Sequence, residues 1–517
     1  MSQVVGNNDD LAFYAEDGVH PEVAKIQNFS GKYPKQLWFL FFSEMWERFC
    51  FYGMRGMLTF FMVYELGKAK DVANLQYGAT QAWVYAFTFI GGLFADQILG
   101  FKKSLFWGGL LMIAGSVILA MDPHKFFFLG IAALVIGTGF FKPNISSMVG
   151  QLYRADDHRR DAGFSLFYSG INIGAFLGGI LMIGIGKGGI LGGVIPEDNR
   201  WQVAFGLVAV VMCISLVTFM MYKHQLGPIG DMPGNMSDRK NRWKEWMVYI
   251  GALACIPVIQ IMVSNTHYTD IFMYIIGPFA LIYLIYEMTK LTWKDNSKLI
   301  AALVFILFSV VFWAIFEQAG GSLAIYAPEH LKSNLLGLPV DPNMVNNSAN
   351  ALFIIFFAPV AGLVWLWLHK RKMEPNGVVK FALGFLFLGI GFYLFFTNKL
   401  FADSNAMTSL NFFAFAYIII TFGELCLSPI GLSLMTKLST QRLQGMMMGM
   451  WFLASAYGQY VAGLFGASIS PAENADRLEK LSVYSEGYKQ FGIYAIVAGI
   501  ILLALSPFIK KLMREVS

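Results

Sequence analysis

The sequence predicts an all-α protein that crosses a membrane many times. Of its 517 residues, 56% are hydrophobic and only 14% are charged, whereas a soluble domain carries roughly 25% charged residues. Runs such as 303–315 and 493–505 are apolar on every face, which is typical of membrane helices and not of the alternating strands of a β-barrel. These observations exclude a soluble globule and leave a polytopic helical membrane protein.

The apolar segments predict fourteen spans, each close to the roughly 20 residues that a helix needs to cross the hydrocarbon core. Six spans in 37–223 precede the hydrophilic segment 224–244, whose Gly and Pro residues are typical of a linker. Two inserted spans follow in 245–292 and six more in 293–512, and the ends 1–36 and 513–517 are tails. The predicted spans are 37–64, 78–100, 104–121, 126–149, 161–186, 202–222, 245–264, 271–289, 299–321, 347–368, 378–397, 410–436, 446–469 and 490–509.

An even number of spans places both termini on one side of the membrane. Lys and Arg are denser in the loops on that side, for example in 223–244 and 290–298, than in the opposite loops. Cytoplasmic loops carry this excess, so we expect both termini in the cytoplasm. The net charge of +5 is then a matter of topology, and we expect no nucleic-acid partner. The N-terminal tail has no basic segment followed by a short apolar core, so we expect no cleavable signal peptide.

Seven charged side chains lie inside predicted spans, where one at a helix centre costs roughly 2.5 to 3.5 kcal/mol on insertion scales. Four acids and three bases leave one surplus negative charge, which a single proton would neutralise. All His residues fall in loops, tails or span ends, so an intramembrane proton must be carried by a carboxylate. Buried ion pairs that only hold helices together remain the structural alternative. The seven are Glu44, Glu47, Arg48, Arg55, Lys142, Glu317 and Glu424.

Other classes of function find little support in the residues. The four Cys residues have no paired spacing, which argues against a disulfide framework or a metal site. An intramembrane enzyme would need a nucleophile with a base and an orienting group, and no such His-rich or Cys-rich set occurs. No GxxxxGK[ST] string is present for ATP. A sensor or scaffold would not need seven intramembrane charges, so a secondary transporter is favoured.

The string EMWERFCFYGMR at 44–55 resembles the ExxERF signature of the proton-coupled oligopeptide transporter family, within the major facilitator superfamily. The strings GGLFADQILGFKK, GTGFFKPN, FYSGINIG, FWAIFEQ and GELCLSP follow in family order. The resemblance covers about residues 33–512 and implies the major facilitator fold, with two six-helix bundles and two inserted helices. It also implies a bacterial inner-membrane protein, because the large outer domain of animal members is reduced here to 398–410. A monomer that uses protons as coupling ion and no other cofactor is implied as well.

The resemblance further implies roles for individual residues. Charge-assisted contacts would hold the two ends of a peptide, with Arg55 and Lys142 on its carboxylate and Glu424 on its ammonium. For the aromatic members, packing in the core or against lipid is the alternative. Proton coupling would involve Glu44, Glu47, Arg48, Lys142 and Glu317; substrate binding Arg55, Tyr52, Tyr85, Lys142, Tyr168, Asn172, Trp313, Phe316, Asn350, Glu424 and Trp451; and gating Asp96, Gly100 and Pro429.

The implied function is proton-driven import of di- and tripeptides by alternating access of the site to the two sides. Arg55 with Glu317, and Lys142 with Glu424, would be the ion pairs between the bundles. Transport of another small anion or zwitterion, such as nitrate or an amino acid, is the alternative. Nitrate alone would not need Glu424.

Three positions depart from the family pattern and concern gating more than substrate class. Animal relatives have a His at the position of Gly78, Gln97 stands where an Arg is frequent, and Ala351 replaces a usual Pro. The two inserted spans have no charge in their cores, so we expect neither of them to contribute to the substrate site. Loss of peptide affinity on changing Gln260 or Asn265 would contradict this expectation.

Overall fold

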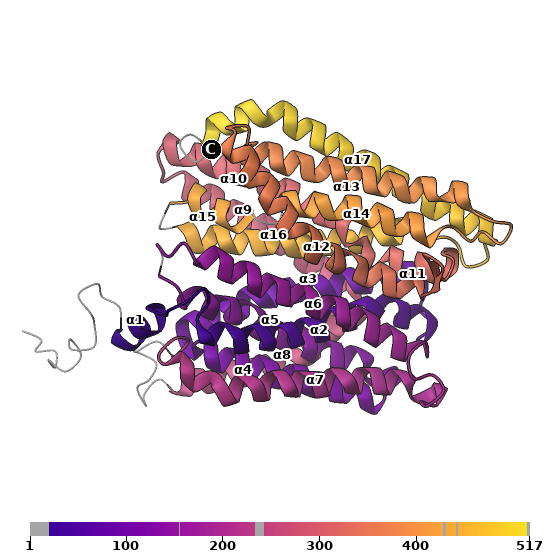
Figure 1. Cartoon of the computed structure of the whole chain (residues 1–517), viewed down its shortest axis with the longest axis horizontal. Helices are drawn as coiled ribbons and strands as arrows, with labels where there is room; N and C mark the ends of the chain where they lie inside the picture. Colours follow the sequence, from indigo (N-terminus) through magenta and orange to yellow (C-terminus); the bar gives the residue numbers. More distant parts are fainter. Residues whose placement is uncertain (1–19, 155, 233–241, 428–430, 441–442, 514–517) are drawn as a thin grey trace, which may run out of the picture.

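The computed structural model describes residues 20–154, 156–232, 242–427, 431–440 and 443–513. Its long helices run side by side along one axis (Figure 1). Helix α1 (Pro21–Gln27) and the C-terminal end of α17 (Arg477–Met513) lie at the same end of the molecule (Figure 1). We call this end the tail side and the opposite end the far side.

Two helical bundles lie next to each other, the N-terminal one in indigo to magenta and the C-terminal one in pink through orange to yellow (Figure 1). The N-terminal bundle consists of α2 (Lys35–Tyr64), α3 (Lys70–Phe94), α4 (Phe101–Met121), α5 (Pro123–Gln151), α6 (Arg160–Gly186) and α7 (Arg200–Tyr222). The C-terminal bundle consists of α10 (Trp293–Phe316), α11 (Ser322–His330), α12 (Pro342–Lys370), α13 (Gly377–Thr397), α14 (Leu410–Leu427), α15 (Gly431–Leu438), α16 (Gln444–Ser468) and α17.

Short elements connect these helices. The far-side helix starts of α5 and α12 use the same local signal, since Asp122 and Asp341 cap the first turn through their side chains and a Pro follows each of them. The short elements are η2 (Ala95–Leu99), η3 (Glu197–Asn199), η4 (Lys223–Leu226), η7 (Glu317–Ala319), η8 (Asn398–Phe401), β1 (Asn334–Leu335) and β2 (Leu338–Pro339).

Twelve helices of the described residues are long and apolar enough to cross a membrane. The predicted spans 37–64 and 446–469 correspond to α2 and α16, which are long helices but are not among the twelve. In α2 the reason is composition, because the helix carries Glu44, Glu47, Arg48 and Arg55 within its span. The all-helical membrane architecture is confirmed, whereas the count of fourteen spans stays a prediction.

Each bundle has its own hydrophobic core. One cluster of buried side chains runs from Leu37 to Val263, and a second one from Leu284 to Met513. A small third cluster joins α3, α16 and α9 (Thr266–Met288). The polar residues between the bundles therefore lie outside both main cores.

One predicted span is an interrupted helix. The span predicted at 299–321 ends as an α-helix at Phe316, and Glu317 begins the 3-10 turn η7 before α11 resumes. Hydrophobic length does not reveal such a break, because an apolar sequence continues across it. The span predicted at 410–436 covers α14 and α15, and 428–430 between them lie outside the described residues.

The two inserted helices, α8 (Arg242–Ser264) and α9, form a hairpin along one flank of the bundles. Its far-side tip bonds to both bundles. On the N-terminal bundle, Gln76 donates to the carbonyl of Ser264 at 2.8 Å and Trp83 donates to Thr269 at 3.1 Å. On the C-terminal bundle, the Tyr460 hydroxyl donates to Asp270 at 2.7 Å.

Candidate functional site

A large cavity of about 1450 Å³ opens between the bundles on the tail side. Side chains of α3, α5 and α6 line it from one bundle, and side chains of α16 line it from the other. Lys142 and Asp96 are among the predicted functional residues that face it. The tail half of the interface is therefore accessible to water.

A smaller cavity of about 80 Å³ lies at the centre of the interface, between residues of both bundles. Its volume accommodates only a few water molecules. The hairpin α8–α9 contributes no residue to this cavity or to the large one, as far as the chain is described. The predicted substrate residues that line the small cavity are Tyr52, Arg55, Tyr168, Asn172, Phe316, Asn350 and Glu424.

The predicted proton cluster in α2 is fully buried. Glu44 and Arg48 form an ion pair at 3.3 Å, and Glu47 is in direct contact with the same guanidinium. The second carboxylate oxygen of each acid, Glu44 Oε2 and Glu47 Oε1, is buried and has no hydrogen-bond partner among the described residues. Two carboxyl groups thus share one Arg, and each keeps one buried oxygen without a partner among the described residues, where a proton would be accommodated.

Lys142 stands close to this cluster on α5. Its ammonium lies 4.7 Å from the centre of the Tyr85 ring and 5.9 Å from that of Phe51, which are cation–π distances. It forms no ion pair with any described residue, so the predicted bridge between Lys142 and Glu424 is not formed in this conformation. Facing the large cavity, Lys142 is a cation available for an anionic group.

Glu424 is buried on α14 and is held by an amide. Asn350 of α12 donates to Glu424 Oε2 at 2.9 Å and to the Thr421 hydroxyl at 3.2 Å. No basic side chain of the described residues pairs with this carboxylate. Glu424 therefore offers an acceptor to a cation that enters the small cavity.

The predicted pair of Arg55 with Glu317 joins the two bundles. The guanidinium of Arg55 is in direct contact with Glu317 Oε2, and its Nε donates to the Tyr77 hydroxyl at 2.8 Å. Both charged side chains are largely buried, with 12% and 3% of their surface exposed. The pair closes the far side of the small cavity.

Further polar contacts close the far side around this pair. The carboxylate of Glu329 on α11 accepts from Lys70 and from the Tyr64 hydroxyl, each at 2.7 Å. Lys187, after α6, forms an ion pair at 2.6 Å with Asp341, before α12. Each of these contacts links one bundle to the other.

At Gly78 the backbones of α3 and α16 touch. A Cβ atom added there would come within 2.7 Å of the Cα of Gly463 and 2.9 Å of the carbonyl oxygen of Gln459. The His that animal relatives carry at this position has no room in this conformation. Glycine permits the close approach of the two helices.

The predicted aromatic residues have different surroundings. Phe316 lines the small cavity, and Trp313 packs against it with ring centres 5.3 Å apart. Trp451 is buried in the C-terminal core and lines neither cavity. For Trp451 the core-packing alternative agrees better with its position.

The predicted loop motif lies at the tail-side end of α3. Gly100 has a positive φ of 72° and allows the chain to turn against the backbone of Asp231, while Lys102 forms an ion pair at 2.8 Å with the carboxylate of Asp231. Asp96 is exposed and accepts no hydrogen bond from the described residues. Pro429 lies outside the described residues.

The comparison with known families decides the class of the protein. The model of the POT family matches residues 102–480. The chain belongs to the POT family. It is 33% identical to the uncharacterized transporter YclF of Bacillus subtilis, over 94% of this chain and 96% of that protein. It is 32% identical to the peptide transporter YePEPT of Yersinia enterocolitica, over 93% of this chain and 96% of that protein.

A solved structure of a POT family transporter in complex with a thioalcohol-conjugated peptide has the same fold. The TM-score is 0.78, with 30% sequence identity over 94% of this chain and 99% of that one. This confirms the predicted fold class and shows that the chain is a transporter and not an enzyme.

Three polar residues of the small cavity in this POT family member were missed by sequence reasoning. Asn346, Asn347 and Tyr417 line it beside the predicted set. Asn346 and Asn350 are four residues apart on α12, so they share one helix face. The string NNSAN at 346–350 was the available signal, but it carries no charge, and the resemblance implied a role only for Asn350.

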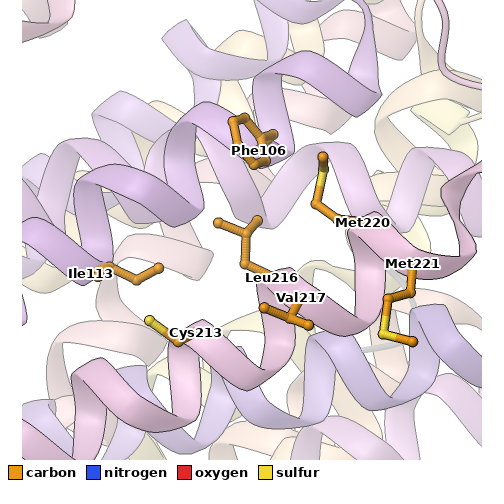
Figure 2. A pocket seen from close by; sticks show the side chains of 7 residues that line it. All are labelled: Phe106, Ile113, Cys213, Leu216, Val217, Met220 and Met221. Atoms are coloured by element: carbon orange, nitrogen blue, oxygen red, sulfur yellow. The ribbon is translucent and has the colours of Figure 1, made fainter.

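A third hollow lies apart from the interface (Figure 2). It is a groove of about 420 Å³ between α4 and α7, and Figure 2 shows that Phe106, Ile113, Cys213, Leu216 and Val217 line it together with two Met side chains. All of these side chains are apolar or weakly polar, and the groove is open to the outside of the bundle. Such a surface suits acyl chains and offers nothing to a charged substrate.

Proposed function

We propose that the chain is a proton-coupled symporter that imports di- and tripeptides by alternating access. The observation that best supports this proposal is the small cavity, where α2 supplies the guanidinium of Arg55 and α14 supplies the carboxylate of Glu424. A cation from one bundle and an anion from the other match the two ends of a zwitterion. A small peptide bridging them would hold the bundles together.

Side chains around the charged pair suit the peptide backbone. Tyr52, Tyr168, Asn172 and Asn350 bring hydroxyl and amide groups to the cavity wall. These groups donate to or accept from peptide bonds without regard to the substrate's side chains. The selectivity for short peptides would then arise from the spacing of the two charged ends, and broad acceptance from the backbone contacts.

The α2 cluster supports protons as the coupling ion. Two buried carboxyl groups share Arg48, and each keeps an unbonded oxygen. Protonating one of them would remove the surplus negative charge, since two unprotonated carboxylates would exceed one guanidinium. Lys142 beside the cluster is free to bind an anionic group, such as a peptide carboxylate or a deprotonated Glu. No other cofactor is needed in this scheme.

Alternating access would use the asymmetry of the interface. With the tail side in the cytoplasm, the present conformation faces inward, because the large cavity opens there and ion pairs close the far side. The small cavity must widen to admit a dipeptide, since it now accommodates only a few water molecules. Both bundles belong to one chain, which supports a monomer as the transporting unit in the bacterial inner membrane.

The membrane potential would supply the driving force. One charge moved inward across 100 mV yields about 2.3 kcal/mol. This corresponds to roughly fifty-fold accumulation of the substrate.

A single amino acid is the second candidate substrate, because the small cavity is narrow and an amino acid has the same charged ends. Nitrate would leave Glu424 without a partner. One uptake assay can distinguish small peptides, single amino acids and nitrate as substrates.

The test is uptake of a labelled dipeptide by purified protein in liposomes, with and without an inward proton gradient. Wild type should accumulate the dipeptide only with the gradient. Glu44→Gln should abolish the gradient dependence, while Arg55→Ala and Glu424→Ala should weaken peptide affinity about tenfold or more, as expected for a lost charge-assisted contact of about 1.5–3 kcal/mol. Glu374→Gln, on the tail-side loop after α12, is the control for a carboxylate outside the interface.

Competition separates the substrates. Excess unlabelled dipeptide or tripeptide should block uptake, whereas amino acids and nitrate should not. Wild-type protein that neither accumulates the dipeptide nor shows peptide-stimulated proton flux, but responds to an amino acid or nitrate, would overturn the peptide assignment.

A further inference from the structure

Two polar stripes face each other between α12 and α14. On α14, Tyr417, Thr421 and Glu424 follow at helical spacing on one face, and on α12 the facing residues are Asn346 and Asn350. All five are buried or nearly so. The stripes extend from Glu424 toward the far side, where Arg55 and Glu317 form the ion pair that closes the small cavity. We call this ion pair the gate pair, and the contacts that close the far side the far-side gate.

Hydrogen bonds connect the stripes at two levels. At the level of Glu424, Asn350 donates to the carboxylate and to Thr421. One helical turn farther, the Tyr417 hydroxyl donates to Asn346 Oδ1 at 2.7 Å. Asn346 Nδ2 in turn donates to the carbonyl of Ala319 at 2.7 Å.

Ala319 is the last residue of the 3-10 turn η7, and Glu317 is its first. The α-helix α10 ends immediately before this turn. Backbone carbonyl groups at such a helix end lack the regular helical partners and need others. The amide of Asn346 supplies a partner to one of the carbonyls of the turn. One buried Asn therefore bonds both to the turn that carries Glu317 and to the helix that carries Glu424.

We propose that Asn346 is a positioning residue that ties the Glu317 turn to α14, so that the far-side gate closes only while α14 holds its place. The inference rests on the proposed function for its transport readouts. In the proposed cycle, a peptide ammonium at Glu424 competes with Asn350 for the carboxylate and disturbs the packing of α14 on α12. The link through Tyr417 and Asn346 transmits this disturbance to the turn, and the Arg55–Glu317 pair responds.

The competing explanation is that Asn346 and Tyr417 only stabilise the fold. Buried hydrogen-bonded side chains do so in general. A purely structural role predicts less folded protein with unchanged conformational populations. A positioning role predicts a shift between conformations in protein that is fully folded.

The first experiment measures the distance between the two bundles on the far side in the absence of substrate. Spin labels are placed at Val194 on the N-terminal bundle and at Leu400 on the C-terminal bundle, both exposed on the far side. The four native Cys residues are first replaced by Ala, and this parent protein must have the same thermal stability as wild type. Tyr417→Phe and Asn346→Asp should each increase the population with the longer distance between labels, relative to the parent protein in lipid nanodiscs.

Tyr417→Phe should raise the ratio of the long-distance to the short-distance population about fivefold. This factor corresponds to the loss of one neutral hydrogen bond of about 1 kcal/mol. Tyr326→Phe is the matched control, because Tyr326 is also buried in the C-terminal bundle and bonds once through its hydroxyl, to Thr408. Equal distance distributions for Tyr417→Phe, Asn346→Asp and Tyr326→Phe would overturn the proposal.

The second experiment tests that the effect passes through Glu317. In the Glu317→Gln background the gate pair is already lost, so adding Asn346→Asp should change the label distances no further. Full additivity of the two substitutions would contradict a path through Glu317. If Asn346→Asp does not fold, Tyr417→Phe in the same background gives the same comparison, because it removes a single hydroxyl.

Transport separates this inference from the proposed function. Tyr417→Phe should lower the maximal rate of proton-driven dipeptide uptake about fivefold, as one lost hydrogen bond predicts, with KM changed less than twofold. A rise of KM without loss of rate would assign Tyr417 to substrate contact and overturn the positioning role. If wild type transports no peptide, the proposed function fails, while the label distances still decide the link between the turn and α14.

Discussion

The interface between the bundles consists of a far half and a tail half, and the two halves are built differently. In the far half, ion pairs and hydrogen bonds cross from one bundle to the other, and the backbones of α3 and α16 touch at Gly78 and Gly463. In the tail half, a cavity of about 1450 Å³ separates the same bundles.

The difference shows how the chain can close one side reversibly. Hydrogen bonds and ion pairs can be exchanged for bonds to water at a small net cost, whereas an apolar interface of the same area would resist opening. A proton that neutralises one carboxylate weakens such a closure directly. The far half therefore combines a close backbone approach, which sets the closed distance, with charges that release it.

The largest expected effect comes from filling the backbone contact. Gly78→Leu adds a whole side chain where a Cβ alone would lie 2.7 Å from the Cα of Gly463. The neighbouring atoms are backbone and cannot move aside like a flexible side chain, so the overpacking destabilises the closed far side directly. We expect loss of the closed far side and at least a tenfold loss of uptake, measured with the Val194–Leu400 labels and in liposomes. Gly251→Leu on α8 is the control, because a Cβ there meets no atom of the described part of the chain within 4 Å. Equal behaviour of the two variants would refute the contact as the closing element.

The next effect concerns the buried gate pair. Glu317→Gln removes the charge opposite Arg55 while keeping the shape, and leaving a buried charge unpaired costs about 3–5 kcal/mol in other proteins. We expect a far side that opens at every pH and a loss of proton-driven accumulation. Counterflow exchange of peptide without a gradient is the measurement that should persist. Normal accumulation by Glu317→Gln would contradict its role in coupling.

A smaller effect is expected at the tip of the inserted hairpin. Tyr460→Phe removes the bond from α16 to Asp270, and a hydrogen bond to a charged group contributes about 1.5–3 kcal/mol. Since the tip also holds α3 through Trp83 and Thr269, we expect the hairpin to favour the closed far side, and Tyr460→Phe to raise the open population with KM unchanged.

The matched control for the hairpin is Tyr249→Phe, which removes a tyrosine bond to Glu245 within α8 itself. A change of peptide affinity in Tyr460→Phe would show that the hairpin contributes to the substrate site, against our expectation. An unchanged label distance would show that it does not act on the gate.

The smallest effect is expected at the partly exposed edge of the far-side contacts. Lys187 and Asp341 are partly exposed, and such ion pairs contribute roughly 0.2–1 kcal/mol and weaken with salt. Lys187→Met should change the far-side population by less than about fivefold at low salt, and the difference should fade in high salt. Lys332→Met, which breaks a pair with Asp403 inside the C-terminal bundle, is the control. An effect that grows with salt would rule out the ion pair as its cause.

Sequence alone predicted much of this architecture for physical reasons. Hydrophobic length reports the helices, and charge inside a span is costly enough that Glu44, Arg55 and Glu424 stand out by their residue type alone. Helical spacing also predicts which of them share a face. The resemblance in ordered strings added the pairing of Arg55 with Glu317.

Other features depend on which helices meet, and spacing along one helix does not reveal a partner helix. Asn346 carries no charge, and its role becomes visible only where α12 faces Tyr417 and the turn after Phe316. Gly78 is one of 52 Gly residues, and only the approach of α16 makes it distinctive. The hairpin contacts at Asp270 were missed for the same reason.

The most direct test of proton-controlled gating is the pH dependence of the far-side distance between labels at Val194 and Leu400. Protonation of Glu317 removes its charge and loosens its hold on Arg55, so we predict that the open population rises as the pH falls. In Glu317→Gln the open population should be high and independent of pH. A distance distribution that stays the same at every pH in the parent protein, and is unchanged in Glu317→Gln, would contradict the proposed coupling of protons to the gate.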